Sequence, residues 1–292
     1  MVDTSLDIGV IQFACSNVAA ENIATASRLI RDAASKGAKI ILPQELFSGL
    51  YFCQEQNPDH FKRAYSVTDD PAVAALSALA GELGVAIPIS FFEKAGQVFY
   101  NTVAMADADG SILGTYRKSH IPDGPGYNEK YYFRSGDTGF RVWDTAHGRV
   151  GVGICWDQWF PEGARTMALL GAEVILYPTA IGSEPGQPAF DSSRHWQRTQ
   201  QGHAAANMTP VAAANRIGSE TVGGKVQSYY GSSFIAGPDG ALVAEAGRDG
   251  EAVLTASFDR DTLARDRATW GLFRDRRPDL YGVISTADGR QS

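Results

Sequence analysis

Cys155 is the residue whose type and position most clearly allow chemistry. The small and β-branched residues Val150–Ile154 before it predict a buried strand. Pro161 and Glu162 are typical of a helix start, and we expect that helix to run to Leu170. A thiol at such a turn lies near backbone N–H groups, which favour a thiolate and can stabilise an oxyanion. Cys155 is therefore a candidate nucleophile, although a small buried core cysteine has the same local sequence.

A cysteine nucleophile needs a base, and charged residues follow two other expected strands. Glu45 comes after the apolar segment 38–43, and Lys118 comes after the segment 112–117. A buried carboxylate can accept the thiol proton, and a lysine can stabilise a developing oxyanion. Glu129, on a loop rich in Gly and Pro, is a second carboxylate that can orient the lysine or the substrate. Taken singly, each also fits a turn cap, a surface charge or an exposed pair.

A cysteine–histidine pair is the alternative arrangement for the same nucleophile. The chain has five histidines. His120, His195 and His203 stand in segments expected to be structured, whereas His60 and His147 stand in peripheral ones. The residues alone leave the cysteine–histidine alternative open.

The elements that must position these residues alternate between helix and strand in both halves. We expect helices over 17–35, 70–83, 161–170, 192–207 and 261–267. We expect strands over 7–14, 38–43, 85–92, 98–107, 112–117, 140–144, 149–154, 173–178, 210–215, 228–236, 241–244 and 252–258. Pro88 inside one of them predicts an edge or a bulge. The pattern predicts two mixed sheets with helices outside, a layered α/β sandwich.

The composition is that of an ordinary globular protein. The chain has 292 residues, 44% of them hydrophobic, and a net charge of −7. We expect a single domain, no nucleic-acid partner because there is no basic run, and no membrane partner because there is no long apolar run. The N-terminus has no signal-peptide pattern, and three cysteines make neither a disulfide framework nor a metal site. The expected location is the reducing cytoplasm.

Three segments resemble the signature segments of the nitrilase superfamily of carbon–nitrogen hydrolases, and they come in that superfamily's order. The segments are Leu42–Phe47, Tyr116–Lys118 and Gly153–Asp157. The resemblance implies an α/β fold of the four-layer αββα sandwich type. It also implies that Glu45 is the general base and Cys155 the nucleophile. Lys118 and the backbone N–H of Trp156 would stabilise the tetrahedral intermediate, and Glu129 would be the supporting carboxylate.

Longer runs resemble the branch of this superfamily that hydrolyses N-carbamoylputrescine. These runs are 50–54, 118–127, 155–162, 177–185, 191–196, 201–204 and 270–278. The resemblance implies a small cationic carbamoyl-amine substrate, no cofactor, and the products putrescine, carbon dioxide and ammonia, a step of polyamine synthesis. Such a substrate needs an apolar slot with a carboxylate at its far end. Glu184 is the candidate carboxylate, and Tyr51, Trp156 and Phe133 are the candidate slot residues.

Other readings of the same residues remain. A carbamoyl amidase for N-carbamoyl amino acids would need an arginine clamp, for which Arg194 and Arg198 are available. A catalytically silent binding module of the same fold is disfavoured by the intact Glu, Lys and Cys, and a nitrilase proper is less favoured still. The resemblance also implies a homo-oligomer that associates through the face of the sandwich. The aromatic residues among arginines over 270–281 are typical of an arm that packs on a neighbour, and we expect this arm to begin at about residue 268.

Overall fold

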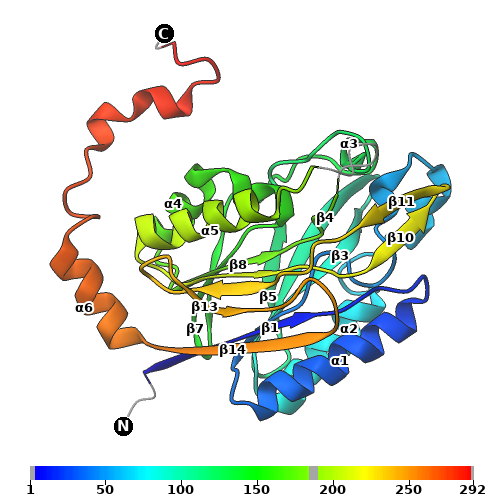
Figure 1. Ribbon diagram of the computed structural model, residues 1–292, viewed down its shortest axis with the longest axis horizontal. Helices are drawn as coiled ribbons and strands as arrows, with labels where there is room; N and C mark the ends of the chain where they lie inside the picture. Colours follow the sequence, from blue (N-terminus) through cyan, green and yellow to red (C-terminus); the bar gives the residue numbers. More distant parts are fainter. Residues whose placement is uncertain (1–3, 184–189, 291–292) are drawn as a thin grey trace.

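Two sheets lie face to face in a computed structural model that describes residues 4–183 and 190–290 (Figure 1). The first sheet consists of two three-stranded parts, with the strand orders β14-β1-β2 and β3-β4-β5. A single β-bridge between Ile40 and Ala86 joins the two parts. The strands of this sheet are β1 Ser5–Gln12, β2 Ile40–Leu42, β3 Ile87–Ala95, β4 Val98–Ala106, β5 Ile112–Arg117 and β14 Ala252–Asp259. Pairing of β2 with β3 is limited to this bridge, so Pro88 lies at an interrupted edge, as expected.

The second sheet has the order β13-β12-β9-β8-β7-β6, and β7, β8 and β9 are parallel. Its strands are β6 Val142–Thr145, β7 Gly148–Val152, β8 Val174–Pro178, β9 Val211–Ala214, β12 Phe234–Ala236 and β13 Leu242–Glu245. A separate hairpin consists of β10 Ser219–Val222 and β11 Lys225–Ser228.

Helices cover the outer face of each sheet. The helices are α1 Ala19–Ser35, α2 Pro71–Leu83, α3 Glu129–Tyr132, α4 Pro161–Leu169, α5 Ser193–Asn207 and α6 Arg260–Trp270. α1 and α2 bury residues such as Leu29 and Leu76 against the first sheet, and α4 and α5 bury Met167 and Trp196 against the second. A further core between the sheets joins side chains of both, including Val10. The four-layer αββα sandwich is therefore confirmed.

Helix ends follow the local signals of the sequence. The side chain of Asp70 accepts hydrogen bonds from two backbone N–H groups in the first turn of α2, where Pro71 is the first residue. Gly84 ends the helix in the left-handed conformation, at φ +63°.

The strand expected over residues 228–236 is wrong. β11 ends at Ser228, and β12 begins only at Phe234. Gly231 and Ser232 between them adopt positive φ angles, and a Cβ at Gly231 would lie 2.6 Å from the Arg248 carbonyl oxygen. This bend follows the hairpin β10–β11, which the pattern did not predict, and it returns the chain to the second sheet.

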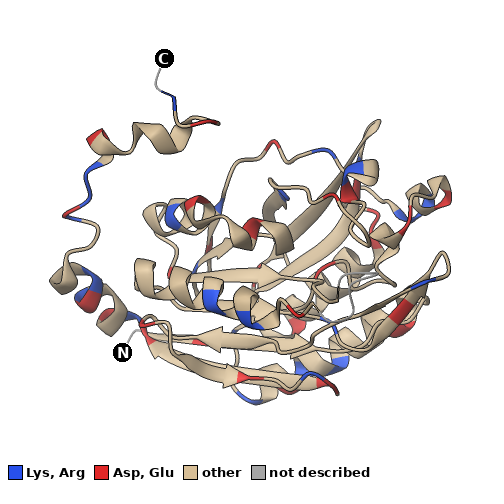
Figure 2. Cartoon of the chain, turned by 45° about the horizontal axis from the view of Figure 1, so that its top comes forward, with Lys and Arg blue, Asp and Glu red and all other residues tan. Residues whose placement is uncertain are grey.

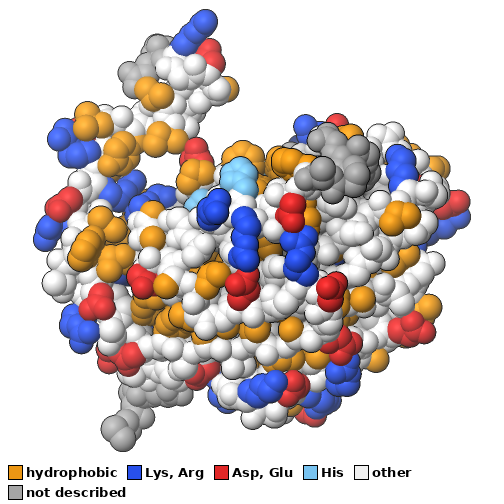
Figure 3. Space-filling model, viewed as in Figure 1, with side chains coloured by type: hydrophobic (Ala, Val, Ile, Leu, Met, Phe, Trp, Pro, Cys, Tyr) orange, Lys and Arg blue, Asp and Glu red, His pale blue; other side chains and the backbone are white. Residues whose placement is uncertain are grey.

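The chain after α6 runs away from the layers (Figure 1). α6 ends at Trp270 with Gly271 as its C-cap, and two short 3-10 turns follow in the described residues, Pro278–Leu280 and Gly282–Ser285. Hydrophobic side chains lie along this segment (Figure 3), and Trp270 and Leu280 are 71% and 64% exposed. Over the layers themselves, Lys and Arg are interspersed with Asp and Glu (Figure 2).

Candidate active site

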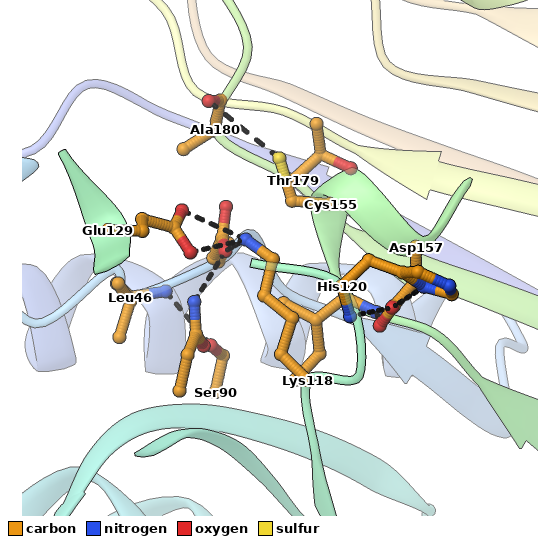
Figure 4. Close-up of polar contacts among 12 residues, drawn as sticks. Leu46, Ser90, Lys118, His120, Glu129, Cys155, Asp157, Thr179 and Ala180 are labelled. Atoms are coloured by element: carbon orange, nitrogen blue, oxygen red, sulfur yellow. Dashed lines mark hydrogen bonds and ion pairs between the residues drawn. The ribbon is translucent and has the colours of Figure 1, made fainter. Parts of the chain in front are cut away.

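Three segments from both sheets bring an acid, an amine and a thiol together. Glu45 follows β2, Lys118 follows β5 directly, and Cys155 follows β7. Glu45 and Lys118 are fully buried, and Cys155 is 6% exposed. Figure 4 shows Lys118 between the carboxylates on one side and the cysteine turn on the other. Residues that are distant in the sequence thus form one buried cluster.

Lys118 makes ion pairs with two carboxylates at once. Its Nζ atom lies 2.9 Å from Oε1 of Glu45 and 2.7 Å from Oε2 of Glu129. Asn101 Nδ2 donates to the same Glu45 oxygen at 2.7 Å, and the Tyr51 hydroxyl donates to Glu129 Oε1 at 2.5 Å. These donors fix both carboxylates around the amine. Glu129 is the first residue of α3, a short helix inside the segment that the sequence predicted to be a loop.

The cluster holds more acid than base, which shifts the pKa values of its members. Burial lowers the pKa of Lys118, but the charges of Glu129 and Glu45 outweigh burial and hold it well above its ordinary value. Burial raises the pKa of Glu129 against the attraction of Lys118, and the charge of Glu45 adds to that rise. Lys118 is therefore a permanent cation in this site.

Cys155 occupies a strained turn. Its φ angle is +42°, which is rare for a residue with a side chain and is found at functional turns. Burial and the nearby charge of Glu45 raise the pKa of its thiol well above the ordinary value. The resting group is therefore a thiol, contrary to the expectation that backbone N–H groups would favour the thiolate. Activation consequently requires a base.

Glu45 has an oxygen available for that proton. Within the described chain its Oε2 atom is buried and has no hydrogen-bond partner, whereas Oε1 is held by Lys118 and Asn101. A buried carboxylate oxygen without a partner is costly unless it serves a function. The arrangement leaves one Glu45 oxygen free to accept the proton of Cys155.

Asp157 fixes the cysteine turn, a role that the sequence did not suggest. Its Oδ2 atom accepts hydrogen bonds from the Ile154 N–H at 2.9 Å and the Tyr116 hydroxyl at 2.8 Å. Its Oδ1 atom lies 2.7 Å from Nδ1 of His120, as Figure 4 shows, and accepts from that residue's backbone N–H. An acid two residues after the thiol therefore holds the turn in place.

The described histidines contact groups other than the Cys155 thiol. His120 contacts Asp157 and stacks on Phe160 with ring centroids 3.7 Å apart. His203 Nε2 lies 2.8 Å from the Gln158 carbonyl oxygen. His195 lies beside the thiol's cavity and packs edge-on against Trp159. Among the described residues, no histidine makes a hydrogen bond with Cys155, so the geometry favours the carboxylate as base.

A buried ion pair that the sequence analysis missed holds the segment after Glu45. Arg216 donates to the carbonyl oxygens of Glu45 at 2.8 Å and Leu46 at 3.2 Å. It also lies 2.6 Å from Glu220, whose other oxygen accepts from the Tyr51 N–H at 2.6 Å. Leu46 has a φ angle of +46°, so this guanidinium supports a strained turn beside the base. Arg216 and Glu220 are only four residues apart, but the hydrogen bonds of Arg216 to Glu45 and Leu46 join segments far apart in the sequence, and no local motif signals them.

A cavity of about 360 Å³ opens above Cys155. Its described lining is Pro122, Asp123, Gly124, Tyr127, Cys155, Trp156, Trp159, Ala180, Ile181, Phe190, Ser192 and His195. Trp156, a candidate slot residue, belongs to this lining and is 40% exposed.

The other candidate slot residues lie elsewhere. Tyr51 is fully buried behind Glu129, and Phe133 is buried in an aromatic cluster, 5.0 Å from Phe92 between ring centroids. Neither belongs to the described lining of the cavity. Glu184 lies outside the described residues.

Arginines and metal-binding residues are the remaining groups that a site might use. Arg194 pairs with Glu245 away from the cavity, and Arg198 is exposed. Over residues 4–183 and 190–290, no group of three His, Cys, Asp or Glu side chains is placed to hold a metal ion. None of the described helices is both long and apolar enough to cross a membrane.

Comparisons with known proteins place this chain among relatives of nearly the same length. The N-carbamoylputrescine amidase of Arabidopsis thaliana is 58% identical over 283 residues, 96% of this chain and 95% of that protein. The citrullinase of Francisella tularensis is 54% identical over 280 residues, 96% of this chain and 98% of that protein. The crystal structure of a carbon–nitrogen hydrolase from Helicobacter pylori G27 superposes with a TM-score of 0.90 at 37% identity, covering 97% of this chain and 99% of that one.

The family model agrees with these relatives. The carbon–nitrogen hydrolase model matches residues 7–268, which include Glu45, Lys118, Glu129 and Cys155. The chain therefore belongs to the carbon–nitrogen hydrolase family.

Proposed function

We propose that this enzyme hydrolyses N-carbamoylputrescine to putrescine, carbon dioxide and ammonia, a step of polyamine synthesis. The observation that carries the substrate is the 58% identity, over nearly the full length, to an N-carbamoylputrescine amidase. The chemistry is supported by the buried cluster of Glu45, Lys118 and Cys155 at the base of a cavity. The described cavity lining includes the aromatic side chains of Tyr127, Trp156, Trp159 and Phe190, which suit a short aliphatic chain.

The first half-reaction transfers the carbamoyl group to sulfur. The free oxygen of Glu45 takes the proton of Cys155, and the sulfur attacks the carbonyl carbon of the urea group. Lys118 Nζ and the backbone N–H of Trp156 stabilise the oxyanion that forms. The C–N bond to the terminal NH₂ group then breaks, and Glu45 returns its proton so that ammonia leaves. A carbamoyl thioester of Cys155 remains.

The second half-reaction releases the enzyme. Glu45 takes a proton from a water molecule, whose oxygen attacks the thioester carbon. The C–S bond breaks, and the sulfur recovers the proton held by Glu45. The product is a carbamic acid, which breaks down to carbon dioxide and the free amine. No step requires a cofactor, and the same carboxylate acts alternately as base and acid.

Glu129 and Tyr51 act through Lys118 in this proposal. Glu129 lies within 2.9 Å of the Lys118 amine with both oxygens, which keeps the amine charged and aimed at the reaction centre. Tyr51 in turn holds Glu129. We assign both a positioning role, since neither belongs to the described lining of the cavity.

A second candidate substrate is a ureido amino acid. The 54% identity to a citrullinase favours it, and it matches the alternative of a carbamoyl amidase for carbamoyl amino acids. Against it, no Lys or Arg belongs to the described lining of the cavity, so a carboxylate tail finds no partner there. The intact Glu, Lys and Cys argue against a silent binding module.

The proposal extends to the whole molecule. Residues 1–292 form a single hydrolase domain with a C-terminal arm from about residue 268. The protein assembles as a homo-oligomer through the face of the sandwich, and the arm packs on a neighbouring subunit. The cytoplasm is its proposed location, in keeping with three cysteines that are all free thiols.

The test is ammonia release from N-carbamoylputrescine, citrulline and N-carbamoyl amino acids. We expect the highest kcat/KM with N-carbamoylputrescine, and we expect the Cys155→Ala variant to show no turnover because no nucleophile remains. Cys53→Ala is the matched control, since Cys53 is also a buried free thiol but has no step in the mechanism. Substantial activity of the Cys155→Ala variant, or a preference for citrulline, would contradict the proposal.

A further inference from the structure

Asp123 contributes an unpaired carboxylate to the cavity above Cys155. It lies on the loop between β5 and α3 and is exposed to solvent. No hydrogen bond or ion pair joins its side chain to another described residue. It is the one acidic side chain among the described residues of the lining. A carboxylate without a partner among the described residues is available to a ligand.

Aromatic side chains surround the same cavity. Trp156 and Trp159 lie with ring centroids 6.2 Å apart at an interplanar angle of 58°. Tyr127 is held in place because its hydroxyl accepts a hydrogen bond from the Gly182 N–H at 3.0 Å. The faces of indole and phenol rings attract cations, most strongly where water is excluded. The Asp123 carboxylate and these aromatic rings together provide the negative charge and the ring faces that bind an ammonium group.

We propose that Asp123 binds the terminal ammonium of the substrate and selects substrates with a cationic tail. This inference rests on the proposed function and names a residue for its specificity. Glu184, the carboxylate suggested by the sequence, lies outside the described residues, and Asp123 is proposed in addition to it. The charge attracts a cationic tail, leaves a neutral one unaffected and repels an anionic one, because no described Lys or Arg in the lining offsets it.

A series of ureas with one tail length and three charges tests this. The series is N-carbamoylputrescine, the neutral N-pentylurea and the anionic 5-ureidopentanoate. For the Asp123→Asn variant we expect KM for N-carbamoylputrescine to rise about 10-fold with little change in kcat, since an exposed ion pair contributes only modestly to binding. We expect kcat/KM for N-pentylurea to stay the same and that for 5-ureidopentanoate to rise several-fold.

Controls separate this effect from a change of fold or of overall charge. Glu162→Gln removes one exposed acid from the first turn of α4, outside the cavity lining, and we expect unchanged selectivity. Asp123→Glu keeps the charge and should retain most of the preference for the cation. An equal loss for all three ureas, or unchanged ratios, would overturn the role of Asp123. A wild-type enzyme that turns over none of the three would instead overturn the proposed function.

Discussion

Lys118 shows how few residues set the chemistry of this site. Its amine is shared between Glu45 and Glu129, at 2.9 Å and 2.7 Å respectively. Burial and the nearby charge of Glu45 hold the pKa of the Cys155 thiol well above its ordinary value, so the thiol keeps its proton in the resting site. The reaction therefore depends on hydrogen bonds that decide which carboxylate is ionised.

The first prediction concerns Tyr51. Its hydroxyl donates to Glu129 and stabilises the charged carboxylate, so the Tyr51→Phe substitution raises the pKa of Glu129 further. Protonated Glu129 no longer holds Lys118, so the acid limb of the kcat/KM profile should move to higher pH. We expect kcat near neutral pH to fall by about 10-fold, from the loss of a hydrogen bond to a charged group.

The measurement is kcat/KM against pH for wild type and variant. Tyr132→Phe is the matched control, because the Tyr132 hydroxyl donates to the Glu55 carbonyl oxygen and not to the catalytic cluster. An acid limb at the same pH in the wild type and in Tyr51→Phe would show that Tyr51 does not tune Glu129.

At the scale of elements, the site depends on short segments that directly follow strands. Side chains far away in the sequence hold these segments in place. Arg216, just after β9, holds the carbonyl oxygens that follow β2, and Glu220 in β10 holds both Arg216 and the Tyr51 backbone. Burial of Arg216 lowers its pKa, but the nearby Cys15 and Glu220 outweigh burial and keep the guanidinium charged. Residues after β9 and in the hairpin β10–β11 thereby position Glu45, the proposed general base, which follows a strand of the first sheet.

The second prediction follows from this brace. Arg216→Lys keeps the charge but cannot reach two carbonyl oxygens and Glu220 together, because an ammonium lacks the guanidinium's planar fork. We expect kcat to fall by about 10- to 100-fold through misplacement of Glu45. We expect a folded protein with a lower Tm, measured by circular dichroism.

Arg267→Lys is the matched control. Arg267 also donates to two backbone carbonyl oxygens, those of Met208 and Ala172, but in a part of the fold away from the site. The Arg267→Lys substitution should lower Tm without a loss of kcat comparable to that of Arg216→Lys. Equal kcat in Arg216→Lys and wild type would refute the bracing role.

The whole molecule has one feature that the sandwich does not use, the segment after α6. Its hydrophobic residues are exposed, for example Leu280 at 64% and Ile284 at 58%. One contact back to the layers places the Arg165 guanidinium 5.1 Å from the centre of the Phe273 ring. Exposed apolar groups on an extended segment are typical of an arm that is buried in an assembly.

The third prediction tests this arm. Removal of residues 272–292 should leave the sandwich folded, since its cores lie within the four layers. We expect the particle mass measured by light scattering to decrease, because the oligomer loses its apolar contacts. Replacement of Leu280 and Ile284 by Ser should act in the same direction. A truncated protein of unchanged subunit number would exclude the arm from the interface.

Local sequence determined much of this protein. Hydrophobic alternation predicted most of the strands, and Asp70, Pro71 and Gly84 set the ends of α2, because these signals act between residues close in the chain. The motifs around Glu45, Lys118 and Cys155 were likewise recognisable without coordinates. The run over 228–236 was misjudged because a bend at Gly231 interrupts residues of high strand propensity.

Only the tertiary structure decided how these residues act together. It showed that Lys118 pairs with two carboxylates and that the Tyr51 hydroxyl holds one of them. It also showed that Arg216 braces the segment after Glu45, and that Asp123 lines the cavity without a partner among the described residues. Each of these facts depends on which distant segments meet and on the angle at which their side chains approach. Hydrogen bonds and ion pairs form over a few ångströms in space, and hydrophobic periodicity along the chain carries no information about them.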